Sequence, residues 1–231
     1  DFMMANNAAW IGFSMEIGPE GGLYVLDWHD GDICGNDVLH KETGRVFRMM
    51  PEQSNAENWE GRYDDLNTFS DLELVNLQLS KSAWHARRAR VILQYRAHKG
   101  NIESAATERL NEIIDTEKNE DLRLRALWSK HVCQLMKPDE LLAYLEEGDP
   151  YFRAWAIQFL TEDQNTSQQV ISELTALAKN EDSPVVRLYF AAAMQRIPLE
   201  KRWGLAENLI AHQVDTDDPN IPLMLWFAIE P

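Results

Sequence analysis

Long apolar segments are missing from this sequence of 231 residues. No run approaches the roughly 18 consecutive apolar residues that a membrane-spanning helix needs. The first residues, Asp1 to Asn7, also lack the basic and then apolar pattern of a signal peptide. Because the chain starts at Asp1 without an initiator Met, we expect the natural N-terminus to lie upstream. The sequence therefore predicts no membrane span, and it does not give the cellular location.

Positive charge is scarce as well. The chain has 22 Lys and Arg against 38 Asp and Glu, which gives a net charge of −16 at pH 7. Such a chain repels the phosphates of nucleic acid, so no nucleic-acid partner is expected. One local exception is the stretch 82–100, where five basic residues occur without a carboxylate between them: Arg87, Arg88, Arg90, Arg96 and Lys99. A solvated or internally paired helix face is the expected structure there, and a docking patch is the alternative.

Cysteine is rare, and the motifs of several enzyme classes are absent. Cys34 and Cys133 are the two cysteines, and a disulfide, a metal pair and two free thiols all remain open. No Cys-x-x-Cys-His motif occurs, which excludes covalent attachment of a c-type haem to this chain. The sequence also has no glycine-rich phosphate loop, nucleophile elbow or zinc-protease motif. It therefore assigns no catalytic residue.

The first part of the chain, residues 1–50, has the pattern of β-strands and turns. We expect strands at Trp10–Ile17, Leu23–Leu26 and Arg45–Met49, because β-branched and aromatic residues flank a cluster of Pro and Gly at 19–22. Three strands make too little sheet, and they leave an open edge and an uncovered face. We therefore expect either that the neighbours of this sheet are missing or that the sheet rests on the helices.

The rest of the chain has the pattern of helices. Residues 51–68 are rich in Asn, Glu and Asp and predict a linker, whereas residues 69–231 predict about five pairs of helices. The expected helices cover residues 71–79, 83–97, 102–118, 121–136, 139–146, 150–160, 168–179, 184–195, 199–211 and 221–229. The predicted fold class is therefore mainly α, with a HEAT-like α-α superhelix preceded by a small β-sheet.

A repeated pattern becomes visible when the second helix of each pair is aligned on one arginine. Asp or Ser begins most of these helices, Pro is common in the first turn, and apolar residues follow at helical spacing. The aligned arginines are Arg88, Arg125, Arg153 and Arg187, and a fifth copy has Leu223 in their place. We expect a stacked row of arginines bound to carboxylates or carbonyls of adjacent repeats. The pattern resembles the HEAT repeat family, with intervals shorter than the roughly 40 residues of that class.

Two longer stretches resemble one particular family. Residues Ile17–Gly31 and Lys41–Arg48 resemble the last blade of bacterial β-propellers related to glucose/sorbosone dehydrogenases. The segment Asp218–Pro231, together with Leu124–Trp128 and Phe152–Ala156, is similar to the helical region that follows such propellers in a family of membrane-bound dehydrogenases. The likeness runs from about residue 10 to residue 231, so this chain would hold the last propeller strands and the helical repeats.

The resemblance implies more about the parent protein than about this chain. In the family an exported propeller is followed by HEAT-like repeats and often by a cytochrome c domain. A periplasmic or otherwise exported location is therefore expected. Haem c, pyrroloquinoline quinone or calcium would be cofactors of the parent, and this chain would hold none of them. The expected partners are other domains of the same polypeptide or a separate protein.

The segment 27–37 groups oxygen ligands with a His and a Cys. Asp27, Asp30 and Asp32 are candidate metal ligands, but position twelve of an EF-hand loop that begins at Asp30 is Lys41 instead of Glu. His29, Cys34 and His40 match no recognised ligand signature either. The sequence therefore commits to no metal site, and turn-forming roles are the alternative.

Tryptophans recur in the second helices, at Trp84, Trp128, Trp155 and Trp226. Trp and Arg dominate protein interfaces, and second helices commonly line the binding face of a solenoid. Each Trp also lies among aliphatic residues, so packing in the core is the alternative. The first functional hypothesis is a non-catalytic scaffold or protein-interaction region of an exported redox protein. The alternative is a share in a sugar or alcohol dehydrogenase site that includes the segment Asp27–Asp37.

Overall fold

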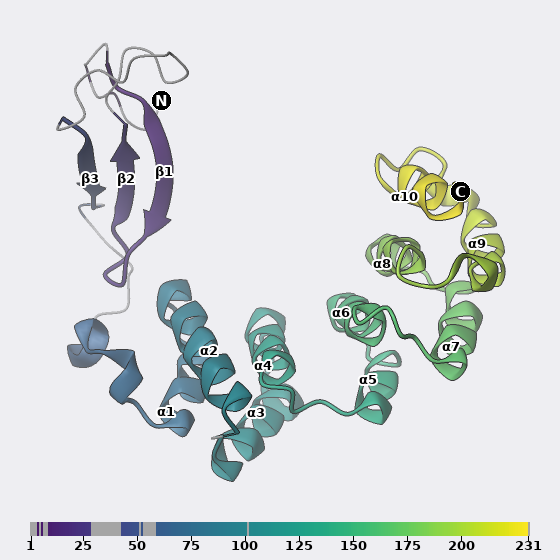
Figure 1. The fold of residues 1–231 in the computed structure, drawn as a ribbon, viewed down its shortest axis with the longest axis horizontal. Helices are drawn as coiled ribbons and strands as arrows, with labels where there is room; N and C mark the ends of the chain where they lie inside the picture. Colours follow the sequence, from purple (N-terminus) through teal and green to yellow (C-terminus); the bar gives the residue numbers. More distant parts are fainter. Residues whose placement is uncertain are drawn as a thin grey trace. The chain divides into compact units, whose positions relative to one another are not determined.

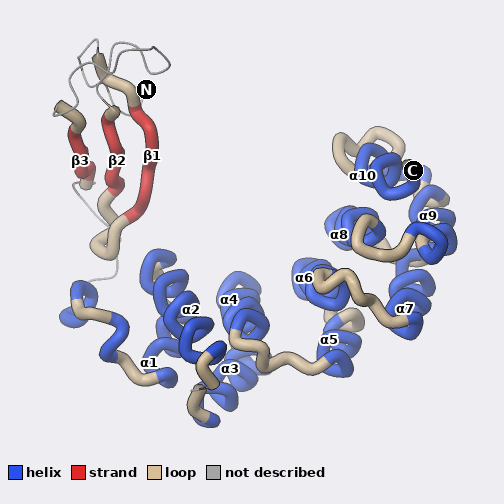
Figure 2. The backbone as a smooth tube through the Cα atoms, viewed as in Figure 1, coloured by secondary structure: helices blue, strands red, loops and turns tan. Residues whose placement is uncertain are grey.

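The computed structural model describes residues 9–28, 43–50, 59–100 and 102–230, together with residues 4, 6 and 52. The chain divides into two compact units, residues 1–111 and 112–231. Helices dominate both the ribbon and the tube, and the strands form one small sheet near the N-terminus (Figures 1 and 2). The predicted fold class, mainly helical with a small β-sheet, is confirmed.

The sheet contains three antiparallel strands in the order β1-β2-β3. Strand β1 covers Gly12–Ile17, β2 covers Leu23–Asp27 and β3 covers Arg45–Met49, close to the expected bounds. Facing residues place Met15, Val25 and Phe47 in one cross-strand row. Trp10 packs edge-on against Phe47, with ring centroids 5.3 Å apart. An apolar row therefore crosses one face of the sheet, and the facing pair Asp27 and Arg45 lies two residues further along the same face.

Caps and the ion pair between Arg96 and Asp71 stabilise the helices of the first unit. They are α1 (Asp71–Asn76), α2 (Ala83–His98) and the first part of α3 (Ser104–Thr116). Short 3-10 helices cover Glu60–Tyr63, Leu66–Thr68 and Leu77–Leu79. Ser70 and Glu73 form a capping box at the start of α1. Arg96 of α2 donates to Asp71 at 2.7 Å and to the carbonyl of Phe69 at 2.9 Å, which joins α2 to the start of α1.

The second unit is built from helical hairpins. Its helices are α4 (Glu120–Val132), α5 (Pro138–Tyr144), α6 (Pro150–Thr161), α7 (Gln168–Ala178), α8 (Pro184–Met194), α9 (Trp203–Ile210) and α10 (Ile221–Ile229). Short 3-10 helices cover Leu199–Lys201 and Gln213–Asp215. We call α4, α6, α8 and α10 the second helices. Each second helix packs on the next, and α7 packs on α9 in a parallel layer (Figure 1).

A polar side chain before each second helix binds backbone N–H groups at the start of that helix. Asn119, Asp149 and Ser183 accept hydrogen bonds from backbone N–H groups in the first turns of α4, α6 and α8. In α10 the N-cap Asn220 makes no such bond, and Asp218, two residues earlier, accepts from the N–H groups of Asn220 and Ile221, both at 2.8 Å. These hydrogen bonds hold the pKa of Asp218 below its usual value. We call each second helix, together with the helix before it, a level, and we align the levels by counting from Asn119, Asp149, Ser183 and Asp218.

Candidate interaction surface

Arginines at the fourth position after the cap connect consecutive levels. We call Arg123, Arg153 and Arg187 the arginine ladder. Arg153 of α6 donates to both carboxylate oxygens of Glu181, at 3.1 and 2.7 Å, and to the carbonyl of Glu147 at 2.7 Å. Because Glu181 lies in the loop before α8, the guanidinium joins the loop before its own helix to the loop of the next level. Such a bidentate pair fixes orientation as well as distance.

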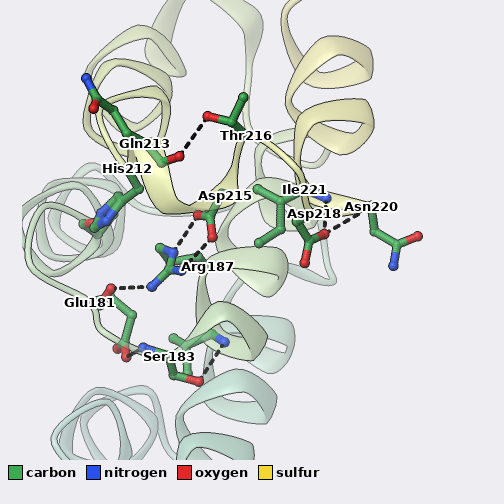
Figure 3. A network of polar contacts seen from close by, with 12 residues as sticks. Glu181, Ser183, Arg187, His212, Gln213, Asp215, Thr216, Asp218, Asn220 and Ile221 are labelled. Atoms are coloured by element: carbon green, nitrogen blue, oxygen red, sulfur yellow. Dashed lines mark hydrogen bonds and ion pairs between the residues drawn. The ribbon is translucent and has the colours of Figure 1, made fainter.

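The next step of the ladder is the most deeply buried, and Figure 3 shows its contacts. Arg187 of α8 donates to both oxygens of Asp215, at 2.6 and 2.5 Å, and to the carbonyl of Glu181 at 2.8 Å. The hydrogen bonds from the guanidinium to Asp215 raise the pKa of Arg187, although burial of the guanidinium acts against this. The two side chains are only 4% and 8% exposed. A charge pair this deep stabilises the fold only while both partners are present.

In α4 the ladder arginine lies two residues before Arg125, which the sequence alignment predicted. Arg123 is the fourth residue after the cap Asn119, and it contacts Glu147 at 3.5 Å and the carbonyl of Ile114 at 2.8 Å. Arg125 is the sixth residue after the cap, at the position of Trp155 in α6 and Tyr189 in α8. In α10 the fourth position is Pro222, one residue before the expected Leu223. Caps, rather than the similarity of neighbouring residues, set the register.

Aromatic side chains form a row across the second helices. Trp128 of α4 packs edge-on against Trp155 of α6, with centroids 5.3 Å apart, and Trp155 lies 6.1 Å from Tyr189 of α8. We call the surface formed by Arg125, Trp128, Tyr151, Trp155, Leu188, Tyr189, Leu223 and Phe227 the second-helix face. Tyr151, Leu223 and Phe227 are about half exposed on it. The two predicted tryptophans Trp128 and Trp155 therefore lie side by side at the surface, half buried.

A groove of about 550 Å³ lies on this face, between α6, α8 and α10. Its lining is mostly apolar and includes Trp155, Leu188, Tyr189, Leu223 and Met224, with the amides of Gln158 and Asn220 as polar groups. Gln158 already accepts a hydrogen bond from Arg196 at 2.7 Å. Large apolar grooves with few polar groups are the usual shape of binding sites. The sequence did not predict that the aromatic row and the groove form one surface. Tyr189 and Trp155 come together because each is the sixth residue after its cap, and the sequence alignment did not count from the caps.

The other candidate residues do not belong to the second-helix face. Trp226 of α10 is 57% exposed and lies on a different side of its helix, and Arg88 is exposed on α2 in the first unit. Asp27 is buried in β2: its Oδ1 accepts from the N–H of Ile11 at 3.0 Å, and its Oδ2 accepts from Arg45 at 2.7 Å. Asp27 thereby joins the end of the central strand β2 to Ile11 and to Arg45 of β3.

Several candidate metal ligands lie outside the described residues, among them Asp30, Asp32, His29, Cys34 and His40. Cys133 is described and is buried at the end of α4. Among the described residues, no three His, Cys, Asp or Glu side chains gather as a metal site would require. In the described part of the chain, every helix is too short or too polar to cross a bilayer.

Comparison of the chain with protein-family models, with curated proteins and with solved structures finds no match.

Proposed function

We propose that the helical part of this chain is a non-catalytic scaffold of HEAT-like repeats whose second-helix face binds another protein domain. One observation carries the proposal: an aromatic row and a groove of about 550 Å³ lie on one continuous face of α4, α6, α8 and α10. Large, half-exposed aromatic side chains beside an apolar groove are the typical centre of a protein interface.

The chemistry of the face indicates what it binds. The lining of the groove is apolar, and Leu223 and Phe227 extend it along α10. A partner would therefore present aliphatic or aromatic side chains, as an amphipathic helix does when it enters a groove. The arginine ladder supports this role, because its contacts between levels fix the spacing of the second helices that line the groove.

The family resemblance suggests the setting of this interaction. In an exported redox protein with a propeller and a cytochrome c domain, the partner would be one of these domains or a separate protein. The enzymatic alternative gains no support from Asp27, since both of its oxygens bind within the sheet. We therefore propose no second function.

Site-specific photo-cross-linking in the full-length parent protein tests the proposal. A photoreactive residue at Tyr189, in the groove, should cross-link to another domain or protein that mass spectrometry identifies. The same residue at Trp203, which is 54% exposed on α9 away from the second-helix face, is the matched control. Trp155→Ala and Leu188→Glu should abolish the cross-link from position 189 without changing the circular dichroism. Equal cross-linking from positions 189 and 203 would show that the face is not selective.

A further inference from the structure

Arg196, just after the end of α8, binds neutral oxygens, whereas each ladder arginine contacts a carboxylate. Its Nη2 donates to Oε1 of Gln158 at 2.7 Å, and its Nε donates to Oγ1 of Thr161 at 3.3 Å. Burial lowers the pKa of Arg196, and the charge of Glu162 opposes this shift. Glu162 itself is bonded to His131 at 2.6 Å. Among the described residues, no carboxylate is therefore bonded to the Arg196 guanidinium.

This arginine fixes the orientation of an amide in the groove of the second-helix face. Gln158 of α6 is one of the polar groups that line the groove. An arginine donates hydrogen bonds and cannot accept them, so the carbonyl oxygen of the Gln158 amide must face Arg196. The Nε2 group lies on the other arm of the planar amide, and no described residue accepts a hydrogen bond from it. Gln158 therefore offers the groove a hydrogen-bond donor and not an acceptor.

A purely apolar occupant does not suit this donor. It would cover Nε2 of Gln158 and leave the donor unsatisfied, which costs more than a typical hydrogen bond contributes. Asn220, the other amide of the groove, is exposed and keeps its access to water. An acceptor on the occupant would remove the cost at Gln158. A carboxylate is the best acceptor, because Arg196 polarises the amide and because hydrogen bonds to a charged group are roughly twice as strong as neutral ones.

We propose that the segment entering the groove is an amphipathic helix of another domain or protein that carries a carboxylate, Asp or Glu, beside its apolar anchors. This inference rests on the proposed function of the second-helix face. Gln158 is the residue that selects the carboxylate, through a hydrogen bond from Nε2. Arg196 is a positioning residue, which holds the amide and places a positive charge behind it.

The net charge of the chain sets the rest of the partner's chemistry. At −16, the chain attracts a segment of net positive charge and repels an acidic one at long range. This repulsion is screened beyond about 8 Å at physiological salt, whereas the contact with Gln158 is a direct hydrogen bond. The partner is therefore a helix with basic residues on its outer face and one carboxylate on its apolar face.

Fluorescence anisotropy of labelled peptides with the 231-residue chain, at about 0.15 M NaCl, tests the proposal. The peptides share leucine anchors at positions i, i+4 and i+7 and lysines on the outer face. They differ only at i+3, between the anchors, where they carry Glu, Gln or Lys. The Glu peptide should bind roughly tenfold more tightly than the Gln peptide, because its hydrogen bond is charge-assisted. The Lys peptide should bind most weakly, since neither Gln158 Nε2 nor Arg196 can accept from it.

Variants of the chain separate selection by Gln158 from general effects. Gln158→Glu still accepts from Arg196 but offers no donor, so it should bind the Lys peptide more tightly than the Glu peptide. Arg196→Met should narrow the preference for Glu over Gln, a ratio that a loss of stability alone would not change. Gln169→Glu is the matched control, because it adds the same charge at an exposed position of α7. It should leave the order of the peptides unchanged.

Trp155→Ala distinguishes this inference from the proposed function. The substitution removes an aromatic wall of the groove and should weaken all three peptides by roughly 30-fold. If the peptides bind equally and Trp155→Ala weakens them, the groove binds helices but Gln158 selects no carboxylate, and the inference is wrong. It is also wrong if no peptide binds, while cross-linking from position 189 still tests the proposed function. A preference for Glu that survives Gln158→Glu, or that Gln169→Glu changes as much, would overturn it as well.

Discussion

Arg187→Ala should destabilise the protein more than any other single change in the arginine ladder. The substitution removes two hydrogen bonds to Asp215 and one to the carbonyl of Glu181. It also leaves Asp215 as a carboxylate that is 8% exposed and has lost its cation. Breaking a buried ion pair from one side costs about 3–5 kcal/mol. This is a large part of the roughly 5–15 kcal/mol that stabilises a typical domain.

Urea unfolding monitored by circular dichroism measures this loss, and the other two ladder positions set the scale. Arg153→Ala should cost about 1.5–3 kcal/mol, because its guanidinium and Glu181 retain some contact with water. Arg123→Ala should cost less, since its contact with Glu147 is 3.5 Å long and that carboxylate is 34% exposed. The double variant Arg187→Met/Asp215→Leu should recover much of the stability, because it leaves no buried charge unpaired. If Arg187→Ala costs no more than Arg123→Ala, burial does not govern these pairs and the reasoning is wrong.

Three further predictions concern single residues. Burial raises the pKa of Glu140, but hydrogen bonds from Lys130 and Tyr144 lower it more, so the net pKa lies below the usual value. The stabilisation from Glu140 is therefore present above pH of about 4.3 and lost as the pH falls through the folded-state pKa, so the free-energy gap to Glu140→Gln should shrink in acid unfolding curves. Asp149→Ala removes the cap of α6 and should lower the free energy of unfolding by about 1 kcal/mol in urea. Gly100→Ala should also cost about 1 kcal/mol by thermal unfolding, because φ at this position is +74° and nothing nearby would clash with a methyl group.

Much of the fold follows from local sequence signals. Capping residues and helical spacing predict α6 and α8 almost to the residue, and the Pro-Gly cluster at 19–22 predicts the turn between β1 and β2. These signals suffice because each acts within one turn of the chain. The assignment of residues 1–50, 51–68 and 69–231 to separate domains stays a prediction.

The register of the ladder was harder to predict. Arg125-Ala126 and Arg153-Ala154 look alike in sequence, which favours aligning them, yet Arg123 makes the contact between levels. Distance from the cap would have given the correct position, since Asn119 and Asp149 each precede the ladder arginine by four residues. The exposure of Trp226 could not be predicted in this way. It depends on what packs against α10, and no local pattern records that.

The shared role of Glu181 makes neighbouring levels depend on one another. Its carboxylate binds Arg153 while its carbonyl accepts from Arg187, so one loop residue belongs to two steps of the ladder. In stacked repeats, stability is a sum of terms within levels and between neighbours, and strong terms between neighbours make fraying from one end costly. If one level opened, a buried charge in the next level would lose its partner. The amides of α6 and α8 are therefore expected to exchange with solvent in a single concerted opening, and not one hairpin at a time.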